Sequence, residues 1–261
     1  MLRSVVAICC LTVWAVSFLT LNAQVPADQA QLTELQAFAR DENLEFLVFE
    51  WGGRVHYVQS AAVKLVFALA PEGASLGHHA YPTLSPDGGR IALVRPAAGR
   101  NEHISVFSLT DGTLSDLSRW EGDVYGLSWS PTGEHIAFVA KDPSYRSLLG
   151  VLDIKRGDVV EVVPSNLGVQ GRVSIDSPPS WSPDGRKIAF EIDQTAGGPD
   201  KRVVAIIDIT SRKGGRLAEG QNPSWSPDGS VIAYYDLRAR NVLTIKPDGS
   251  GKKKLFSPYS L

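Results

Sequence analysis

Six polar residues stand just ahead of a repeated Ser-Pro-x-Gly segment, and their types could support binding or catalysis: His79, Asp123, Tyr125, Asp176, Gln221 and Asn222. Their imidazole, carboxylate, phenol and amide groups can all hydrogen-bond a polar ligand. Two carboxylates with an imidazole could also act as acid and base in a lyase or hydrolase. No arginine lies among them, although a carboxylate substrate such as a uronate calls for an arginine clamp. Ligand binding is therefore favoured over catalysis, and the alternative is that these are solvated loop residues.

The same region also contains residue types of a metal site and of a nucleophile elbow. Four neighbouring residues are of metal-ligand type: His78, His79, Asp123 and Asp176. Adjacent histidines on an extended segment point in opposite directions, so only one of the pair can face a shared ion. The segment 73–77 matches the nucleophile-elbow pattern around Ser75, but a β-strand is expected after it where the elbow needs a helix. We therefore predict no metal, no cofactor and no catalytic residue.

Four copies of one segment position these residues. The first serine of each Ser-Pro-x-Gly falls at residues 85, 130, 182 and 226, so the spacings are 45, 52 and 44 residues. A period of about 40–50 residues built from short strands is typical of a β-propeller, with one four-stranded blade per repeat. The sequence thus predicts an all-β protein, a β-propeller of about five four-stranded blades after an N-terminal signal segment, with closure of the ring left open.

Each copy has the chemistry of a tight turn between two strands. Proline presets φ at the second position, glycine takes the left-handed conformation at the fourth, and the serine hydroxyl can accept backbone N–H groups. A tryptophan precedes three of the turns, at 129, 181 and 225, and its fixed place in the repeat predicts packing between blades. The strands expected after the turns are residues 90–95, 135–140, 187–192 and 231–236.

The third strands are expected at residues 103–109, 148–154, 202–209 and 241–245, each followed by a glycine turn and a short fourth strand. Ahead of the first full copy, residues 44–51, 54–59 and 64–69 predict three strands of a blade that lacks its inner strand. Residues 43–261 are therefore assigned to the propeller, and residues 24–42 to a linker with one short helix.

The N-terminus predicts export. Residues 1–23 have a basic start, an apolar stretch and a small residue at a cleavage position, as in a signal peptide; an uncleaved membrane anchor is the alternative. Both cysteines lie inside this segment, so the mature chain would have none, which suits a bacterial periplasmic or secreted protein. Without Arg3, 25 basic and 28 acidic residues give a net charge of −3, which does not favour nucleic acid as a partner.

The Trp-Ser-Pro-Asp-Gly-x-x-Ile-Ala-Phe copies resemble the WD-like propeller repeats of the TolB family over roughly residues 43–256. The resemblance implies a propeller and a protein partner in the cell envelope, since TolB proteins bind a peptidoglycan-associated lipoprotein at the propeller mouth. TolB proteins also carry an α/β domain and six blades, which this sequence does not show. Similar repeats form the propellers of prolyl-oligopeptidase-like peptidases and of oligogalacturonate lyases.

Together these features predict an exported, non-enzymatic propeller that recognises a protein or peptide at its channel mouth. A carbohydrate-active lyase or hydrolase with a site in the channel is the first alternative. A degenerate propeller without any ligand is the second.

Overall fold

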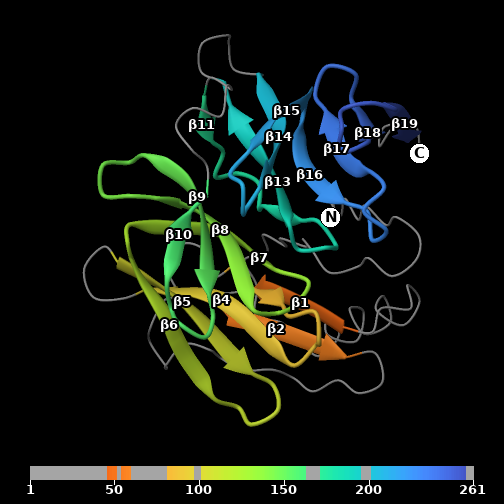
Figure 1. The fold of residues 1–261 in the computed structure, drawn as a ribbon. Helices are drawn as coiled ribbons and strands as arrows, with labels where there is room; N and C mark the ends of the chain where they lie inside the picture. Colours follow the sequence, from red (N-terminus) through yellow and green to blue (C-terminus); the bar gives the residue numbers. More distant parts are fainter. Residues whose placement is uncertain are drawn as a thin grey trace, which may run out of the picture. The chain divides into compact units, whose positions relative to one another are not determined.

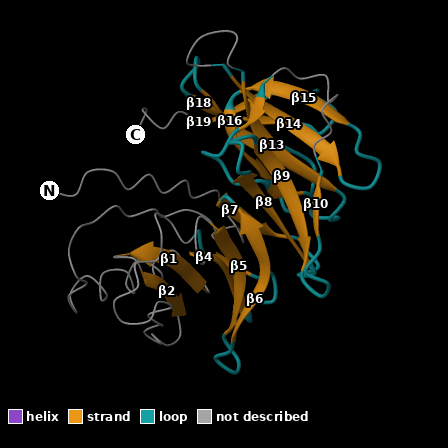
Figure 2. Ribbon diagram, turned by 90° about the vertical axis from the view of Figure 1, so that its left-hand side faces the viewer, coloured by secondary structure: helices purple, strands orange, loops and turns teal. Residues whose placement is uncertain are grey.

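The computed structural model describes residues 46–51, 54–59, 81–96, 101–162, 171–194 and 201–256. Several predicted features lie outside these ranges: the signal segment, the linker, the strand at 64–69, and His78 and His79. The described residues form strands and loops only (Figure 2). They contain no helix with the length and hydropathy that crossing a membrane requires.

The strands form antiparallel sheets that follow the sequence order, as the repeats predict for a β-propeller (Figure 1). We call the four larger sheets blades 1 to 4. Blade 1 contains β3 (Thr83–Leu84), β4 (Arg90–Pro96), β5 (Asn101–Ser108) and β6 (Leu114–Glu121). Blade 2 contains β7 (Asp123–Trp129), β8 (His135–Lys141), β9 (Ser147–Asp153) and β10 (Val159–Glu161). A separate pair, β1 (Phe46–Trp51) and β2 (Arg54–Gln59), matches two of the strands predicted ahead of the first repeat.

Blade 3 contains β13 (Lys187–Asp193), β14 (Arg202–Asp208) and β15 (Gly214–Glu219), with an inner strand split into β11 (Arg172–Val173) and β12 (Ser180–Trp181). The split falls where Pro178 and Pro179 lack the N–H groups that a continuous ladder needs. Blade 4 contains β16 (Gln221–Trp225), β17 (Ile232–Asp236), β18 (Asn241–Ile245) and β19 (Lys253–Phe256). The prediction of four-stranded blades is therefore confirmed for four sheets.

The Ser-Pro-x-Gly turns have the predicted geometry in all four copies. Their glycines, at 88, 133, 185 and 229, have φ between 67° and 69°. Each serine hydroxyl accepts the backbone N–H five residues later, at 2.8–3.0 Å. In three copies the hydroxyl also donates to the turn aspartate, at 2.5–2.7 Å. The turn is thus closed by side-chain bonds that the sequence itself supplies.

Two of the three repeated tryptophans, Trp181 and Trp225, pack between neighbouring sheets. Trp181 lies in one buried cluster with Ala137 and Leu149 of blade 2 and with Phe190 of blade 3. Its indole Nε1 donates to the carbonyl of Ser128 in blade 2, 3.0 Å away. The inter-blade prediction is therefore confirmed for Trp181.

Trp225 repeats this arrangement one blade later, in a buried cluster with Ala189 and Val204 of blade 3 and Ile232 of blade 4. Its backbone N–H donates to the hydroxyl of Ser180, 3.0 Å away.

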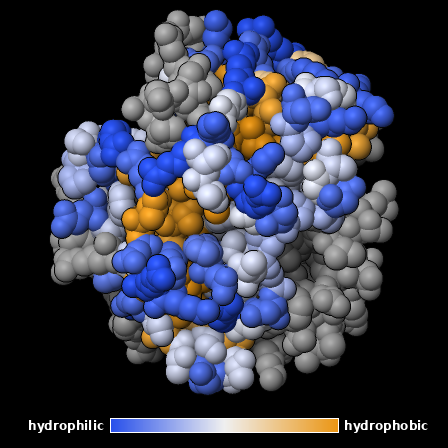
Figure 3. Space-filling model, in the orientation of Figure 1, coloured by the Kyte–Doolittle hydropathy of each residue, from blue (hydrophilic) through white to orange (hydrophobic). Residues whose placement is uncertain are grey.

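In the view of Figure 3 the described surface is mostly hydrophilic, with smaller hydrophobic areas among the hydrophilic residues.

Contacts divide the chain into two compact units, which are described separately. The first comprises residues 1–96 and 105–115, and the second comprises residues 97–104 and 116–261. Blades 2, 3 and 4 belong entirely to the second unit, and five of the six predicted binding residues lie there.

Candidate functional site

The predicted binding residues of blades 2, 3 and 4 lie where the inner strands begin, and we call this end of the second unit the mouth. Asp123 is the first residue of β7, and Gln221 and Asn222 open β16. Asp176 lies in the loop between β11 and β12. Asp123, Asp176 and Asn222 are exposed to solvent, whereas Tyr125 and Gln221 are half-buried. The mouth therefore presents carboxylate and amide groups to solvent.

Arg202, the first residue of β14, connects several of these side chains. Its Nη2 donates to Oδ2 of Asp176 at 2.7 Å, and its Nη1 donates to Oε1 of Gln221 at 3.1 Å. Nη1 also lies 3.1 Å from Oε1 of Glu191, and Nε lies 3.6 Å from Oδ1 of Asp193. Each guanidinium nitrogen therefore faces an oxygen atom of the protein itself.

Glu191 is the buried member of this network. Its side chain is 0% exposed, and its Oε2 accepts the backbone N–H of Asn222 at 3.1 Å. Burial raises the pKa of Glu191, while the Asn222 N–H and the Arg202 guanidinium oppose that shift by favouring the carboxylate. Because Asn222 belongs to blade 4, this carboxylate joins the mouth ends of two blades.

A second group belongs to the start of blade 2. The Tyr125 hydroxyl lies 3.4 Å from Oδ2 of Asp123, and the Lys141 ammonium lies 5.7 Å from the centre of the Tyr125 ring. Burial, followed by the charge of Asp123, raises the pKa of Tyr125 to about 12. The phenol therefore stays protonated at neutral pH and serves as a hydrogen-bond donor rather than a base.

The inner strands of blades 2 and 3 approach each other closely at Gly126 and Pro178. Gly126 has φ 42°, and a Cβ atom built on it would lie 2.8 Å from Cα of Pro178. Only glycine allows this approach without a shift of the backbone. The structure thus brings Asp176 and Gln221 together around Arg202, and Asn222 is linked to them through Glu191. Asp123 and Tyr125 lie on the adjoining blade.

Sequence reasoning missed Arg202 and Glu191, and the expectation that no arginine accompanies these residues is wrong. Arg202 comes from a third strand and Glu191 from a second strand, whereas the predicted residues all come from segments ahead of the inner strands. One signal was present, because Glu191 interrupts the apolar run of β13 between Phe190 and Ile192. A carboxylate buried in a strand needs a cationic or N–H partner nearby.

Comparison with known proteins identifies the family to which this chain belongs. The family model for the TolB beta propeller domain matches residues 78–258, well over half of the chain. The chain belongs to the TolB β-propeller family. A protein TolB homolog from Chlorobium luteolum is 33% identical over 214 residues, which are 77% of this chain and 46% of that protein. This chain therefore spans less than half the length of that TolB relative.

Solved structures show the same fold. A putative TolB from Agrobacterium tumefaciens has a TM-score of 0.62 at 19% identity, covering 82% of this chain and 77% of that one. TolB from Acinetobacter baumannii has a TM-score of 0.51 at 18% identity, covering 90% and 63%. An oligogalacturonate lyase in complex with manganese has a TM-score of 0.57 at 11% identity, covering 82% and 62%. TolB-type propellers therefore share their architecture with at least one enzyme.

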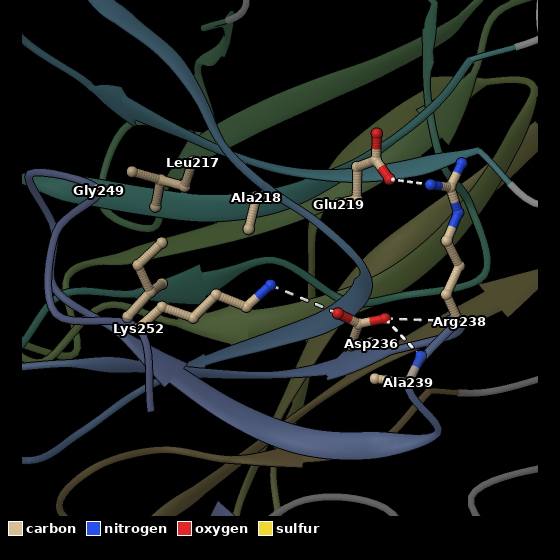
Figure 4. A pocket seen from close by; sticks show the side chains of 9 residues that line it. Leu217, Ala218, Glu219, Asp236, Arg238, Ala239, Gly249 and Lys252 are labelled. Atoms are coloured by element: carbon tan, nitrogen blue, oxygen red, sulfur yellow. Dashed lines mark hydrogen bonds and ion pairs between the residues drawn. The ribbon is translucent and has the colours of Figure 1, made fainter. Parts of the chain in front are cut away.

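The described residues of this TolB-type propeller include no group of three His, Cys, Asp or Glu side chains that could hold a metal ion. They do include an open pocket of about 410 Å³ along the seam between β15 and blade 4, where the lining residue Glu219 lies two positions before Gln221 (Figure 4). Its charged side chains face each other in pairs: Arg238 lies 3.3 Å from Glu219, and Lys252 lies 3.4 Å from Asp236. The polar groups of this pocket are thus largely engaged with one another.

Proposed function

We propose that this protein is an exported, non-enzymatic propeller that binds a protein or peptide of the cell envelope at its mouth. Kinship with TolB supports both the periplasmic location and the envelope partner. The binding residues would be Asp123, Tyr125, Asp176, Gln221 and Asn222, with His79 as the sixth member predicted from the sequence. A segment at 1–23 that is cleaved, or kept as an anchor, would direct the chain to that compartment.

The network around Arg202 is the observation that carries this proposal. It fixes Asp176 and Gln221 in place before any ligand arrives, and a preorganised surface binds at a lower entropic cost. Asp176 is nevertheless 54% exposed, so part of its carboxylate can still accept hydrogen bonds from a partner. The mouth therefore offers fixed acceptors to an incoming N–H or cationic group.

A carbohydrate-active lyase or hydrolase is the second candidate, favoured by the arginine at the mouth and by the shared fold with an oligogalacturonate lyase. A uronate carboxylate would need the donors of Arg202, and these already face Asp176, Glu191, Asp193 and Gln221. The raised pKa of Tyr125 likewise removes a potential base at neutral pH. Binding therefore accounts for the geometry better than catalysis does.

Affinity capture from a bacterial envelope extract tests the proposal. The tagged mature chain is compared with an Asp123→Ala/Asp176→Ala double variant, and captured proteins are identified by mass spectrometry. We expect one envelope protein to be lost with the double variant while the thermal midpoint changes little, because exposed carboxylates contribute little to stability. Equal capture by both chains would refute the mouth as the site and favour a propeller without a ligand. Cleavage of a polygalacturonate by the purified chain would favour the enzyme instead.

A further inference from the structure

The hairpin between β8 and β9 is held in one conformation by its own side chains. Oδ1 of Asp142 accepts the backbone N–H groups of Ser144 and Arg146 at 2.9 and 3.0 Å, and the Ser144 hydroxyl at 2.6 Å. The Arg146 guanidinium donates to Oδ2 of Asp142 at 3.1 Å and to both oxygens of Glu161, at 2.7 and 3.1 Å. A bidentate arginine pair together with a capped turn makes this hairpin rigid.

The tip of the hairpin presents Tyr145. This residue is 66% exposed, the highest value among the large hydrophobic residues that the structure describes as exposed. Its φ is 62°, a left-handed conformation that is unfavourable for a residue with a Cβ atom. A large aromatic ring is therefore held toward solvent at a position where asparagine or glycine would be more stable.

The hairpin lies at the same end of blade 2 as the predicted binding residues. Asp123 pairs directly with Lys141 in the β7–β8 register, and Asp142 is the next residue along the chain. The Lys141 ammonium faces the Tyr125 ring. Blade 2 thus carries a continuous series of groups at this end, from the carboxylate of Asp123 to the ring of Tyr145.

We propose that Tyr145 is an anchor of the protein interface, inserting its ring into an apolar recess on the surface of the envelope partner. The inference rests on the proposed function and extends its contact area outward along blade 2. A rigid, exposed tyrosine supplies large contact area at low entropic cost, and tyrosines are enriched among interface residues that dominate affinity.

The surroundings of Tyr145 favour a protein over the other macromolecules. Asp142, Arg146 and Glu161 form a mixed network with an excess of acid, which does not favour a phosphate backbone. The residues next to Tyr145 in the sequence have charged and hydroxyl side chains, whereas burial in a lipid surface needs a broad apolar area. A protein pocket with a polar rim matches a single ring within a charged border.

Site-specific photo-crosslinking in cells tests the proposal. The photoreactive residue p-benzoylphenylalanine replaces Tyr145 in the full chain, and in a matched control it replaces Lys155. Tyr145 lies just before β9 and Lys155 lies just after it, so the control residue is at the opposite end of the same sheet. We expect an adduct from position 145 alone, with the same protein whose capture depends on Asp123 and Asp176. An adduct with another protein, equal adducts from both positions, or none from position 145 would overturn the inference.

Two substitutions separate binding from folding. Tyr145→Asn should weaken capture about tenfold or more, as loss of an interface anchor does. Asparagine is chosen because it tolerates the left-handed conformation, and the midpoint of unfolding is measured on the same sample. Tyr145→Phe keeps the ring and should capture the partner within about threefold of the wild type. Undiminished capture by the Tyr145→Asn chain would contradict the anchor role while the proposed function stands. If no captured protein depends on Asp123 and Asp176, the proposed function itself fails, and the inference with it.

Discussion

The guanidinium of Arg202 donates to the carboxylate of Asp176 at 2.7 Å, although 26 residues separate them and each belongs to a different part of blade 3. The same side chain reaches the buried carboxylate of Glu191 and the amide oxygen of Gln221 in blade 4. One arginine is thus both a structural partner of a buried acid and the support of two predicted binding residues.

Replacing Arg202 by alanine should destabilise the protein substantially. The buried carboxylate of Glu191 would lose its cationic partner and keep neutral donors, the Asn222 N–H and the Ser174 side chain, and removing one partner of a buried ion pair costs about 3–5 kcal/mol. Arg202 is itself 28% exposed, so we expect the lower end of that range in urea unfolding. Arg216 is a matched control, because its pair with Glu219 is open to solvent and its removal should cost less than about 1 kcal/mol. Equal, small losses for both variants would contradict the structural role of Arg202.

The raised pKa of Glu191 predicts a pH dependence of stability. Since burial moves this pKa above its ordinary value of 4.5, the folded protein keeps a proton that the unfolded chain has already released. The contribution of Glu191 therefore favours folding below that value and declines as the pH rises through the folded-state pKa. The measurement compares the free energy of unfolding of the wild type with that of the Glu191→Gln variant. The wild-type value minus the variant value should decrease as the pH rises from about 4. A difference that increases with pH would mean that the Arg202 pair outweighs burial.

The two inter-blade tryptophans should respond differently to phenylalanine. Trp181→Phe loses the hydrogen bond to the Ser128 carbonyl, worth about 0.5–1.5 kcal/mol. Trp225→Phe removes an indole N–H that is buried without a hydrogen-bond partner among the described residues. Trp181→Phe should therefore cost about 1 kcal/mol more in urea unfolding followed by circular dichroism. Truncating Trp181 to alanine should cost about 3–5 kcal/mol, and a loss below about 1 kcal/mol would place the ring on the surface.

The turn of blade 2 should gain from an aspartate. Thr132 stands where the other three turns have aspartate, and its hydroxyl lies 3.2 Å from the Ser130 hydroxyl and 3.4 Å from the Glu134 amide nitrogen. The aspartate of blade 3 makes the same two contacts at 2.6 and 3.0 Å. Thr132→Asp should therefore stabilise by about 0.5–1 kcal/mol, and Asp184→Thr should destabilise by a similar amount. Changes of the opposite sign would show that the nearby charge of Glu134 dominates.

Local chemistry made most of the fold predictable. The conformation of each Ser-Pro-x-Gly turn depends on residues within the turn, so Ser182 and Gly185 could be placed from sequence alone. The network at the mouth depends on contacts between strands and blades, such as that of Glu191 with Asn222. No periodic pattern reports such a contact, because its residues change from blade to blade: between blades 1 and 2 the carboxylate of Glu102, in a third strand, accepts the backbone N–H of Val124. Repetition thus reveals the architecture, and departures from repetition reveal the site.

The contact between Arg202 of blade 3 and Gln221 of blade 4 restricts how the repeats can be rearranged. In the register of its second and third strands, blade 2 has Val139 where blade 3 has Glu191, and Ser147 where blade 3 has Arg202. Blade 2 nevertheless has the same kind of Ser-Pro-x-Gly turn and a tryptophan at the same place in the repeat. Inserting an additional copy of blade 2 between blades 3 and 4 would separate the guanidinium of Arg202 from the side-chain oxygen of Gln221. In repeat shuffling or propeller engineering, blades 3 and 4 therefore form one inseparable module, whereas the turn and the tryptophan are exchangeable parts.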